Sequence, residues 1–451
     1  MARVGLVLVF AIVLGLGLSR PGTTEAQGAR TVVIGGLDSP RGLAFGPDGK
    51  LYVAEAGSGG DEQSAWVPPF QTAKIGTSAR ILKIDGGQST VVASGLQSVA
   101  LGPAAEVTGA NDLAFIGSTL YAVVGQANPL PTGTQTFSLL VKVGADGKAE
   151  TVADLGKYER DNNPDGTVPD SNPFGLVAAP DGNLYVADAG GNDVLKVTPA
   201  GQVTTAMAWK DNPVPTTVAF DKQGRAHVAF LSHAPFAVGS SRLERLTSSG
   251  SEIVVPALTM IVDLKIGPDG MPYVLQHSGE FVTSPPPPKM LPNSGRVLRV
   301  GPNGLEEMVG GLNFPTKMAF GPDGALYVSN NAVGAPKNGE ILKLTLPASG
   351  TPVTVAPAPQ ASPAAGPSPA AKPAAPAAPA PVASPVPAAK PAAAPAQAPA
   401  AAKPAAVASP SALPRTGVGP DVLSAVAPFA GAGAAFTIVG LGLLGRRRRK
   451  S

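Results

Sequence analysis

The chain has 451 residues, no cysteine and a formal net charge of +3. The lack of cysteine excludes disulfides and thiolate chemistry, so a secreted domain of this sequence must be held together by its apolar core. The positive charge comes from the two ends. Residues 1–26 carry +1 and the residues after Thr416 carry +4, which leaves −2 for residues 27–416. This balance gives no indication of a nucleic-acid partner.

Residues 1–26 have the layout of a secretory signal peptide. Arg3 precedes the apolar run VGLVLVFAIVLGLGLS, and small residues lead to Ala26, after which we expect cleavage. A retained membrane anchor is the alternative, although the apolar run is at the short end for spanning a bilayer.

Residues 27–350 repeat one pattern, which predicts an all-β fold, a six-bladed β-propeller. The clearest copies are RGLAFGPDGKLYVAEAG (41–57), FGLVAAPDGNLYVADAG (174–190) and TKMAFGPDGALYVSNNA (316–332), and weaker copies begin at 111, 216 and 262. Each copy reads as a strand, a tight glycine turn, a second strand, a variable loop, and a third and fourth strand. The equivalent ring positions of the second strands are Tyr52, Tyr121, Tyr185, His227, Tyr273 and Tyr327.

The segment RTVVIGGL (30–37) reads as a fourth strand that has no first three strands ahead of it. The last repeat ends with its third strand, within EILKLTL (340–346). We therefore expect the N-terminal strand to complete the final blade, which would close the ring and remove an exposed sheet edge. TPVTV (351–355) is the alternative occupant of that place.

Every long loop of the repeats falls on one face of the predicted propeller, named here the long-loop face, whereas the opposite face carries only short turns. The long loops are 56–79, 125–138, 156–173, 231–241 and 276–295. Long loops on a rigid scaffold often carry function, so we predict a ligand-binding site on this face, around the mouth of the central channel. Its candidate residues are Glu55, Asp161, Asn162, Asn163, Asp165, Asp170, Asn172, Asp188 and Asn330.

Carboxylate and amide oxygens suit Ca²⁺. Glu55, Asp188 and Asn330 end the second strands of three blades and are the candidate metal ligands, with turn capping by the same side chains as the alternative.

His233 and His277 lie in long loops and are candidate catalytic bases, unless they are solvated loop residues. We expect His227 to pack within its strand. No serine-histidine-aspartate order, phosphate-binding loop or zinc spacing stands out in the sequence.

Residues 351–412 consist almost entirely of Pro, Ala, Val, Ser and Lys. This composition cannot bury a core and predicts a disordered, extended stalk of at most roughly 190 Å. Beyond it lie the LPRTG motif (413–417), an uncharged apolar run at 422–445 that predicts a transmembrane helix, and a basic tail at 446–451 that we expect in the cytoplasm.

This order of parts resembles the sortase cell-wall sorting signal of Gram-positive-type bacteria, whose pattern is Leu-Pro-any-Thr-Gly, an apolar span and a positive tail. The motif residues are Leu413, Pro414, Arg415, Thr416 and Gly417. The resemblance implies that a sortase cleaves after Thr416 and attaches the secreted protein to cell-wall peptidoglycan, outside the cell. A membrane-anchored protein with an uncleaved tail is the alternative.

The repeat pattern of Gly-Pro-Asp-Gly followed by Leu-Tyr-Val-Ala-Asp is similar to that of NHL and SMP-30 propellers. GLDSPRGLAFGPDGKLYVAEAG (36–57), ERDNNPDG (159–166) and DSNPFGL (170–176) more closely resemble the bacterial ScyD/ScyE family, over about residues 30–350. SMP-30-type lactonases hold a divalent metal with channel Glu, Asn and Asp residues. Glu55, Asp188 and Asn330 are the nearest matches, but the Asn-Gly and Ser-Pro-Asp ligand segments of that class are not found intact.

Three functions are consistent with these patterns. The leading hypothesis is a wall-displayed propeller that binds a glycan, small metabolite or partner protein through the long-loop face. The alternatives are an extracytoplasmic metal-dependent lactonase or sugar-dehydrogenase-like enzyme in the channel, and a structural surface-layer protein.

Overall fold

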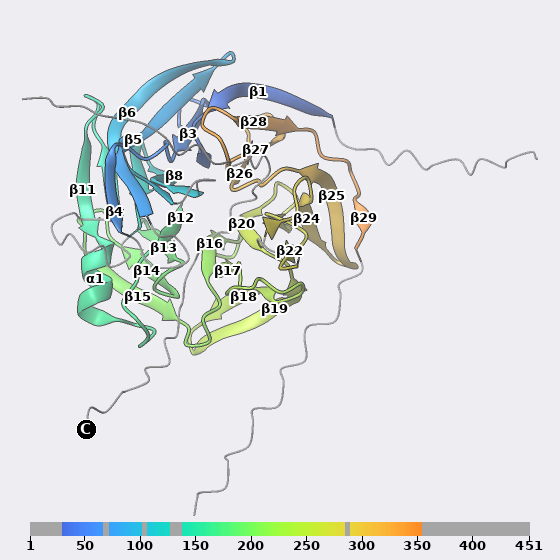
Figure 1. Ribbon diagram of the computed structural model, residues 1–451. Helices are drawn as coiled ribbons and strands as arrows, with labels where there is room; N and C mark the ends of the chain where they lie inside the picture. Colours follow the sequence, from blue (N-terminus) through green and yellow to red (C-terminus); the bar gives the residue numbers. More distant parts are fainter. Residues whose placement is uncertain (1–28, 66–71, 102–105, 127–137, 285–288, 354–451) are drawn as a thin grey trace, which may run out of the picture. The chain divides into compact units, whose positions relative to one another are not determined.

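The computed structural model describes residues 29–65, 72–101, 106–126, 138–284 and 289–353. These residues form six antiparallel blades around a central channel (Figure 1), which confirms the predicted six-bladed all-β propeller. The predicted signal peptide, stalk, LPRTG motif and transmembrane helix lie outside the described residues. Within the described ranges, no helix is long and apolar enough to cross a membrane.

Each blade is a meander whose first strand lies next to the channel and whose fourth strand lies at the outside. Blade 1 contains β2 (Pro40–Phe45), β3 (Leu51–Glu55), β5 (Thr72–Asp85) and β6 (Gln88–Leu101), with β4 (Glu62–Ala65) and β7 (Glu106–Thr108) added to them. Blade 2 contains β8 (Ala110–Ile116), β9 (Thr119–Val124), β10 (Leu139–Val143) and β11 (Ala149–Asp154). Blade 3 contains β12 (Pro173–Ala178), β13 (Leu184–Asp188), β14 (Asp193–Val197) and β15 (Val203–Ala208).

The second half of the ring follows the same plan. Blade 4 contains β16 (Pro215–Phe220), β17 (Ala226–Phe230), β18 (Ser241–Thr247) and β19 (Gly250–Leu258). Blade 5 contains β20 (Ile261–Ile266), β21 (Pro272–Gln276), β24 (Gly295–Gly301), β25 (Gly304–Leu312) and β29 (Thr351–Pro352). Blade 6 contains β26 (Met318–Phe320), β27 (Leu326–Asn330), β28 (Gly339–Leu344) and β1 (Arg30–Leu37).

The N-terminal strand closes the ring. β1 pairs antiparallel with β28, from Arg30 opposite Leu344 to Leu37 opposite Gly339, so the two ends of the described chain share blade 6. The competing segment goes elsewhere, because β29 pairs with β25 at the outer edge of blade 5. The predicted closure is therefore confirmed, and it gives the outer edge of β28 a partner.

Three of the predicted long loops contain regular structure that the repeat pattern did not reveal. Part of the 56–79 loop is β4 paired with the first half of β5, which lengthens blade 1 on the long-loop face. The 156–173 loop begins with a helix, α1 (Leu155–Asn162), whose first turn is capped when the Asp154 carboxylate accepts a hydrogen bond from the Lys157 N–H. A small sheet of β22 (Phe281–Val282) and β23 (Lys289–Met290) lies within the 276–295 loop.

The repeated turn aspartate and tyrosine form one packing unit that holds four of the six blades to the next blade. In blade 6 the Tyr327 hydroxyl donates to Asp323 Oδ2 at 3.0 Å, and Lys343 from the third strand pairs with the same carboxylate at 2.7 Å. The Tyr327 ring meets the Phe45 ring of blade 1 edge-on, with the centroids 5.0 Å apart. The same edge-on contacts join Tyr52 to Phe115, Tyr185 to Phe220 and Tyr273 to Phe320.

Substitutions of Tyr327 test whether the edge-on ring contacts stabilise the propeller. Tyr327→Ala removes the ring contact across the closure, and we expect it to lower the free energy of unfolding by about 3 kcal/mol. Tyr327→Phe removes only the hydrogen bond to Asp323 and should cost about 1 kcal/mol or less. Urea denaturation of both variants measures the difference, and Tyr121→Phe is the control, since Tyr121 has no turn aspartate at the equivalent position. Equal losses in the two Tyr327 variants would contradict a role for ring packing.

Candidate functional site

Six equivalent positions of the repeat surround the channel, and three of them carry charge. They are Gly42, Asp112, Gly175, Thr217, Asp263 and Lys317. The glycines are required by the close approach of neighbouring blades. A Cβ atom on Gly42 would lie 2.5 Å from the Cα atom of Asp112, and one on Gly175 would lie 2.4 Å from the Thr216 carbonyl oxygen.

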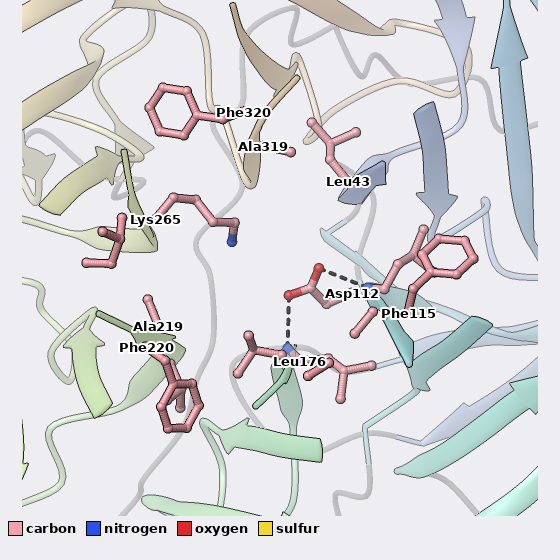
Figure 2. Close-up of a pocket in the computed structure, with 15 residues that line it drawn as sticks. Leu43, Asp112, Phe115, Leu176, Ala219, Phe220, Lys265, Ala319 and Phe320 are labelled. Atoms are coloured by element: carbon pink, nitrogen blue, oxygen red, sulfur yellow. Dashed lines mark hydrogen bonds between the residues drawn. The ribbon is translucent and has the colours of Figure 1, made fainter. Parts of the chain in front are cut away.

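A cavity of about 350 Å³ lies at the end of the channel where the first strands lead into the short turns (Figure 2). Its charged lining residues are Asp112 and Lys265, and its walls are apolar. The wall residues are Leu43, Leu113, Ala114, Phe115, Leu176, Val177, Ala178, Val218, Ala219, Phe220, Ile266, Ala319 and Phe320. An apolar cavity with a few polar groups is the usual form of a small-molecule site.

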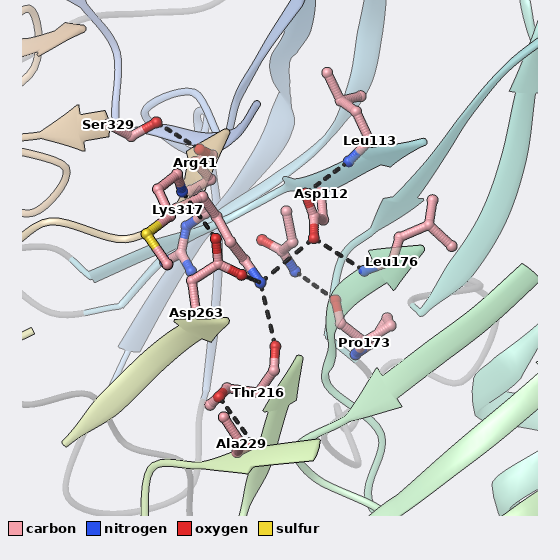
Figure 3. A network of polar contacts seen from close by, with 12 residues as sticks. Arg41, Asp112, Leu113, Pro173, Leu176, Thr216, Ala229, Asp263, Lys317 and Ser329 are labelled. Atoms are coloured by element: carbon pink, nitrogen blue, oxygen red, sulfur yellow. Dashed lines mark hydrogen bonds and ion pairs between the residues drawn. The ribbon is translucent and has the colours of Figure 1, made fainter. Parts of the chain in front are cut away.

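Lys317 spans the channel beside this cavity and is only 1% exposed. Its ammonium lies 3.4 Å from Asp112 Oδ2 and 3.8 Å from Asp263 Oδ1, and it donates to the Thr216 carbonyl at 3.1 Å (Figure 3). The ring of Phe174 lies 4.6 Å from the ammonium and adds a cation–π contact. Burial lowers the pKa of Lys317, and the two carboxylates oppose that shift.

The two channel carboxylates also join neighbouring blades. Asp112 Oδ2 accepts a hydrogen bond from the Leu176 N–H at 2.9 Å, and Asp263 Oδ2 accepts one from the Met318 N–H at 2.8 Å. Lys265 completes the cluster with its ammonium 2.8 Å from Asp263 Oδ1. Burial opposes the charge of Lys265, but Asp263 and Asp112 outweigh it and raise the pKa of this ammonium. Two carboxylates and two ammonium groups thus balance each other.

Lys265 differs from Lys317 in its access to the cavity. Its side chain is 28% exposed and lines the cavity, and it has one close carboxylate partner, Asp263. A lysine ammonium carries three donors, so Lys265 can still donate to a ligand.

The three predicted metal ligands each have hydrogen-bond partners within their own blade. Each one ends a second strand and binds the segment that leads into the first strand of its own blade. Glu55 Oε1 accepts from the Asp38 N–H at 2.7 Å, and its other oxygen pairs with Arg80. Asn330 Oδ1 accepts from the Asn313 N–H at 2.9 Å.

Asp188 has the same role in blade 3, where one carboxylate oxygen accepts from the Asn172 N–H at 2.6 Å and the other from the Ser171 hydroxyl at 2.5 Å. In the part of the chain that the structure describes, no three carboxylate or histidine side chains form a ready-made metal site. The contacts of Glu55, Asp188 and Asn330 are those expected of turn-capping side chains, and their role as metal ligands stays a prediction.

The other predicted ligand residues of the 156–173 loop divide into two groups. Asp161 and Asn162 are exposed on α1, and Asn163 ends the helix in a left-handed conformation with φ of 41°. The second group, Asp165, Asp170 and Asn172, is buried beside Asp188 at the end of blade 3.

Glu159 and Asp193 join this buried group, and the sequence analysis missed both. Burial, together with the charges of Asp188, Asp165 and Asp170, raises the pKa of Glu159 to about 8. Burial also raises the pKa values of Asp170 and Asp193, and Asp188 adds to both shifts. Asp193 could have been found from the repeat, because it opens the third strand directly opposite Asp188. Glu159 could not, because no helix was expected there.

The histidines have different environments. His277 is fully buried, with Nδ1 2.8 Å from the Pro315 carbonyl oxygen and its ring beside Phe314, and burial lowers its pKa to about 4. His233 is exposed. His227 is buried in its strand with Nε2 3.1 Å from Asp221 Oδ2, where it replaces the repeat tyrosine. A catalytic role for His233 or His277 stays a prediction.

No protein-family model matches the sequence, and no curated protein sequence is significantly similar to it. Solved structures with SMP-30-like and gluconolactonase-like propellers are its structural neighbours. The gluconolactonase of Xanthomonas campestris is 14% identical, with 72% of this chain and 91% of that chain covered and a TM-score of 0.44.

Two further neighbours are as distant. The calcium-binding protein regucalcin of Agrobacterium tumefaciens is 16% identical, with 72% of this chain and 96% of that chain covered and a TM-score of 0.44. The aldose sugar dehydrogenase of Streptomyces coelicolor, in its PQQ-bound form, is 16% identical, with coverages of 71% and 99% and a TM-score of 0.44. Similarity at this level does not carry an activity over to this chain.

The buried channel cluster predicts a large effect for loss of its central cation. Lys317→Met leaves Asp112 and Asp263 short of a positive charge, and we expect a loss of about 3 kcal/mol in the free energy of unfolding. Lys343→Met removes an exposed partner of Asp323 and should have a much smaller effect. Chemical denaturation of the two variants measures both, and a similar small loss in each would contradict the role given to Lys317.

The burial of His277 predicts a pH dependence of stability. The pKa of His277 falls from 6.5 in the unfolded chain to about 4 in the folded protein, so the unfolded chain takes up the proton first as the pH is lowered. The free energy of unfolding is therefore highest above pH 6.5 and decreases as the pH falls toward 4. The loss should approach about 3 kcal/mol. Unfolding free energies of the wild type and His277→Asn at pH 4.5 and 7 isolate this slope, and His233→Asn is the exposed control. An identical pH slope in all three proteins would contradict the buried, neutral state of His277.

Proposed function

We propose that this propeller binds a compact small molecule in the channel cavity and that the chain displays it on the cell surface. The observation that carries the proposal is the juxtaposition of an apolar cavity of about 350 Å³ with the donor-bearing side chain of Lys265. The ligand site predicted from the sequence lies on the long-loop face, at the other end of the channel, and the contacts of Glu55, Asp188 and Asn330 give it less support.

The lining sets the chemistry of the ligand. Phe115, Phe220 and Phe320 are among the thirteen apolar lining residues, which favour a compact apolar body such as a ring. Lys265 donates, so the ligand needs an acceptor oxygen such as a carboxylate, carbonyl or hydroxyl group. The Asp112, Asp263, Lys265 and Lys317 cluster is balanced in charge, so a neutral ligand is compatible as well as an anionic one.

Surface display rests on sequence features outside the described residues. The signal peptide, the Pro/Ala-rich stalk and LPRTG together support secretion followed by sortase attachment to peptidoglycan. The ScyD/ScyE resemblance is consistent with a secreted propeller, and an unidentified partner at the long-loop face stays part of the proposal.

An enzyme in the channel is the second candidate function. A carboxylate and an ammonium at one cavity, as with Asp112 and Lys265, are groups that acid–base chemistry uses. A metal-dependent lactonase would need Glu55, Asp188 and Asn330 to bind the metal, and these side chains already accept hydrogen bonds within their own blades. A structural surface-layer protein would need neither the cavity nor its charged lining.

A binding measurement with 2-naphthoate, which has a flat apolar body and a carboxylate, tests the proposal. We expect saturation-transfer NMR to detect binding to the wild type and Lys265→Met to weaken it about tenfold, because a charge-assisted hydrogen bond is lost. Lys148→Met, at an exposed turn in blade 2, should bind as the wild type does.

A second variant tests the cavity without touching its charges. Ala178→Phe places at the end of the first strand of blade 3 the residue that blades 1, 2, 4 and 6 carry at the equivalent position. The fold should therefore accept it, while the cavity that Ala178 lines narrows. Unchanged 2-naphthoate binding in both cavity variants would contradict the proposed site. Turnover of glucono-1,5-lactone or glucose that is lost in Lys265→Met would favour the enzyme instead.

A further inference from the structure

A group of buried acidic side chains closes the long-loop end of blade 3, away from the channel cavity. It consists of Glu159 on α1, Asp165 and Asp170 in the loop that follows, and Asp188 and Asp193 at the ends of the β13–β14 hairpin. We propose that this group holds one calcium ion, with Glu159, Asp170 and Asp193 supplying carboxylate oxygens. The inference does not depend on the function proposed for the channel.

The first support is that these three carboxylates are buried and have oxygens without a partner. Asp193 is 0% exposed, and neither of its carboxylate oxygens accepts a hydrogen bond. Glu159 Oε1 and Asp170 Oδ1 are likewise buried and unbonded, in side chains that are 1% and 8% exposed. A buried carboxylate requires a compensating charge or hydrogen bond, and these four oxygens have no hydrogen-bond partner among the described residues, although the Asp170 carboxylate also accepts a backbone hydrogen bond from Ser171.

The remaining two carboxylates are already satisfied, which separates them from the proposed ligands. Asp188 accepts hydrogen bonds from Ser171 and Asn172 and from the backbone of its own hairpin. Asp165 accepts from the N–H and hydroxyl of Thr167 and from Asn192. Within the described ranges, no lysine or arginine forms an ion pair with any of the five carboxylates.

Gly191 in the β13–β14 hairpin leaves space for oxygens of the group to approach the hairpin backbone. A Cβ atom on Gly191 would lie 3.1 Å from Glu159 Oε2 and 3.5 Å from the Asp170 backbone carbonyl, so the missing side chain leaves room for both oxygens. Asp193 stands directly opposite Asp188 in the β13–β14 register, at the base of the same hairpin. α1 and the loop that follows it thus meet the hairpin at Gly191.

Calcium suits this arrangement better than other cations. All the available donors are oxygens, and no sulfur or imidazole belongs to the group, which disfavours zinc and copper. In the described residues no three of these carboxylates already lie close enough together to hold an ion. Their side chains would turn toward the ion when it binds, and a carbonyl such as that of Asp170, together with water, would complete its ligands. Calcium accepts six to eight oxygens in irregular geometry, whereas magnesium demands a near-ideal octahedron. The bound ion would join α1 to the hairpin and order the long loop of blade 3.

Thermal melting of the full chain after EDTA treatment, with and without added CaCl₂, tests this inference. We expect calcium at about 100 times its Kd to raise the melting temperature by roughly 5 °C, because the ion binds the folded protein alone. MgCl₂ should give a smaller rise. Isothermal titration with CaCl₂ should give one site per chain.

The variant Asp193→Asn makes the test specific. It should abolish most of the calcium shift, and in EDTA it should melt at or above the wild-type temperature, because a neutral amide replaces a buried carboxyl group that has no hydrogen-bond partner. That second readout distinguishes loss of a ligand from loss of the fold, and Glu159→Gln should behave in the same way. Glu150→Gln, an exposed residue of blade 2, is the control and should keep the full shift. No calcium shift in the wild type, a full shift in Asp193→Asn, or an equal shift with magnesium would overturn the calcium assignment.

Discussion

The contact on which the channel depends is the buried ammonium of Lys317 between two carboxylates from blades 2 and 5. A propeller leaves the inner edge of every first strand facing its axis, where backbone and side-chain polar groups must find partners away from bulk water. Asp112 and Asp263 accept backbone N–H groups of the next blades, and Lys317 supplies the charge that allows both to be buried. Lys317, Asp112 and Asp263 thus fill the channel at the height of the middle of the first strands. The cavity lies beyond them, on the side of the short turns.

Around this centre, the ring is held by contacts repeated from blade to blade. A turn aspartate orients a tyrosine, and the tyrosine ring packs edge-on against a phenylalanine of the next blade. Because the same few residue types do this in most blades, they were visible in the sequence as Pro-Asp-Gly and Leu-Tyr-Val. Closure by the N-terminal strand was predictable for the same reason, since RTVVIGGL is a fourth strand without a blade of its own.

What the sequence could not supply is the set of contacts that departs from the repeat. Lys317 stands where other blades have glycine, threonine or aspartate, and only the folded ring shows that it reaches Asp112 and Asp263 across the channel. The carboxylates that end the second strands were expected to form a shared site, yet Glu55 and Asp188 bind within their own blades. Long loops pointed to one face, whereas the cavity opens among short turns, where loop length gives no signal.

The same limit applies to the acidic group of blade 3. The loop motif ERDNNPDG drew attention to Asp165 and its neighbours, but the helix that buries Glu159 does not share the periodicity of the repeat. Both proposed sites lie where the sequence departs from the repeat. The channel cavity has Lys265 where other blades have small apolar residues, and the acidic group of blade 3 includes Glu159 on the inserted helix α1.

A crystal structure of the propeller soaked with 2-naphthoate would test the central claim most directly. Binding in the channel predicts density in the cavity that Phe220, Phe320 and Lys265 line, with the carboxylate within hydrogen-bond distance of the Lys265 ammonium. Density confined to the long-loop face, or a channel cavity that stays free of the ligand at saturating concentration, would contradict it.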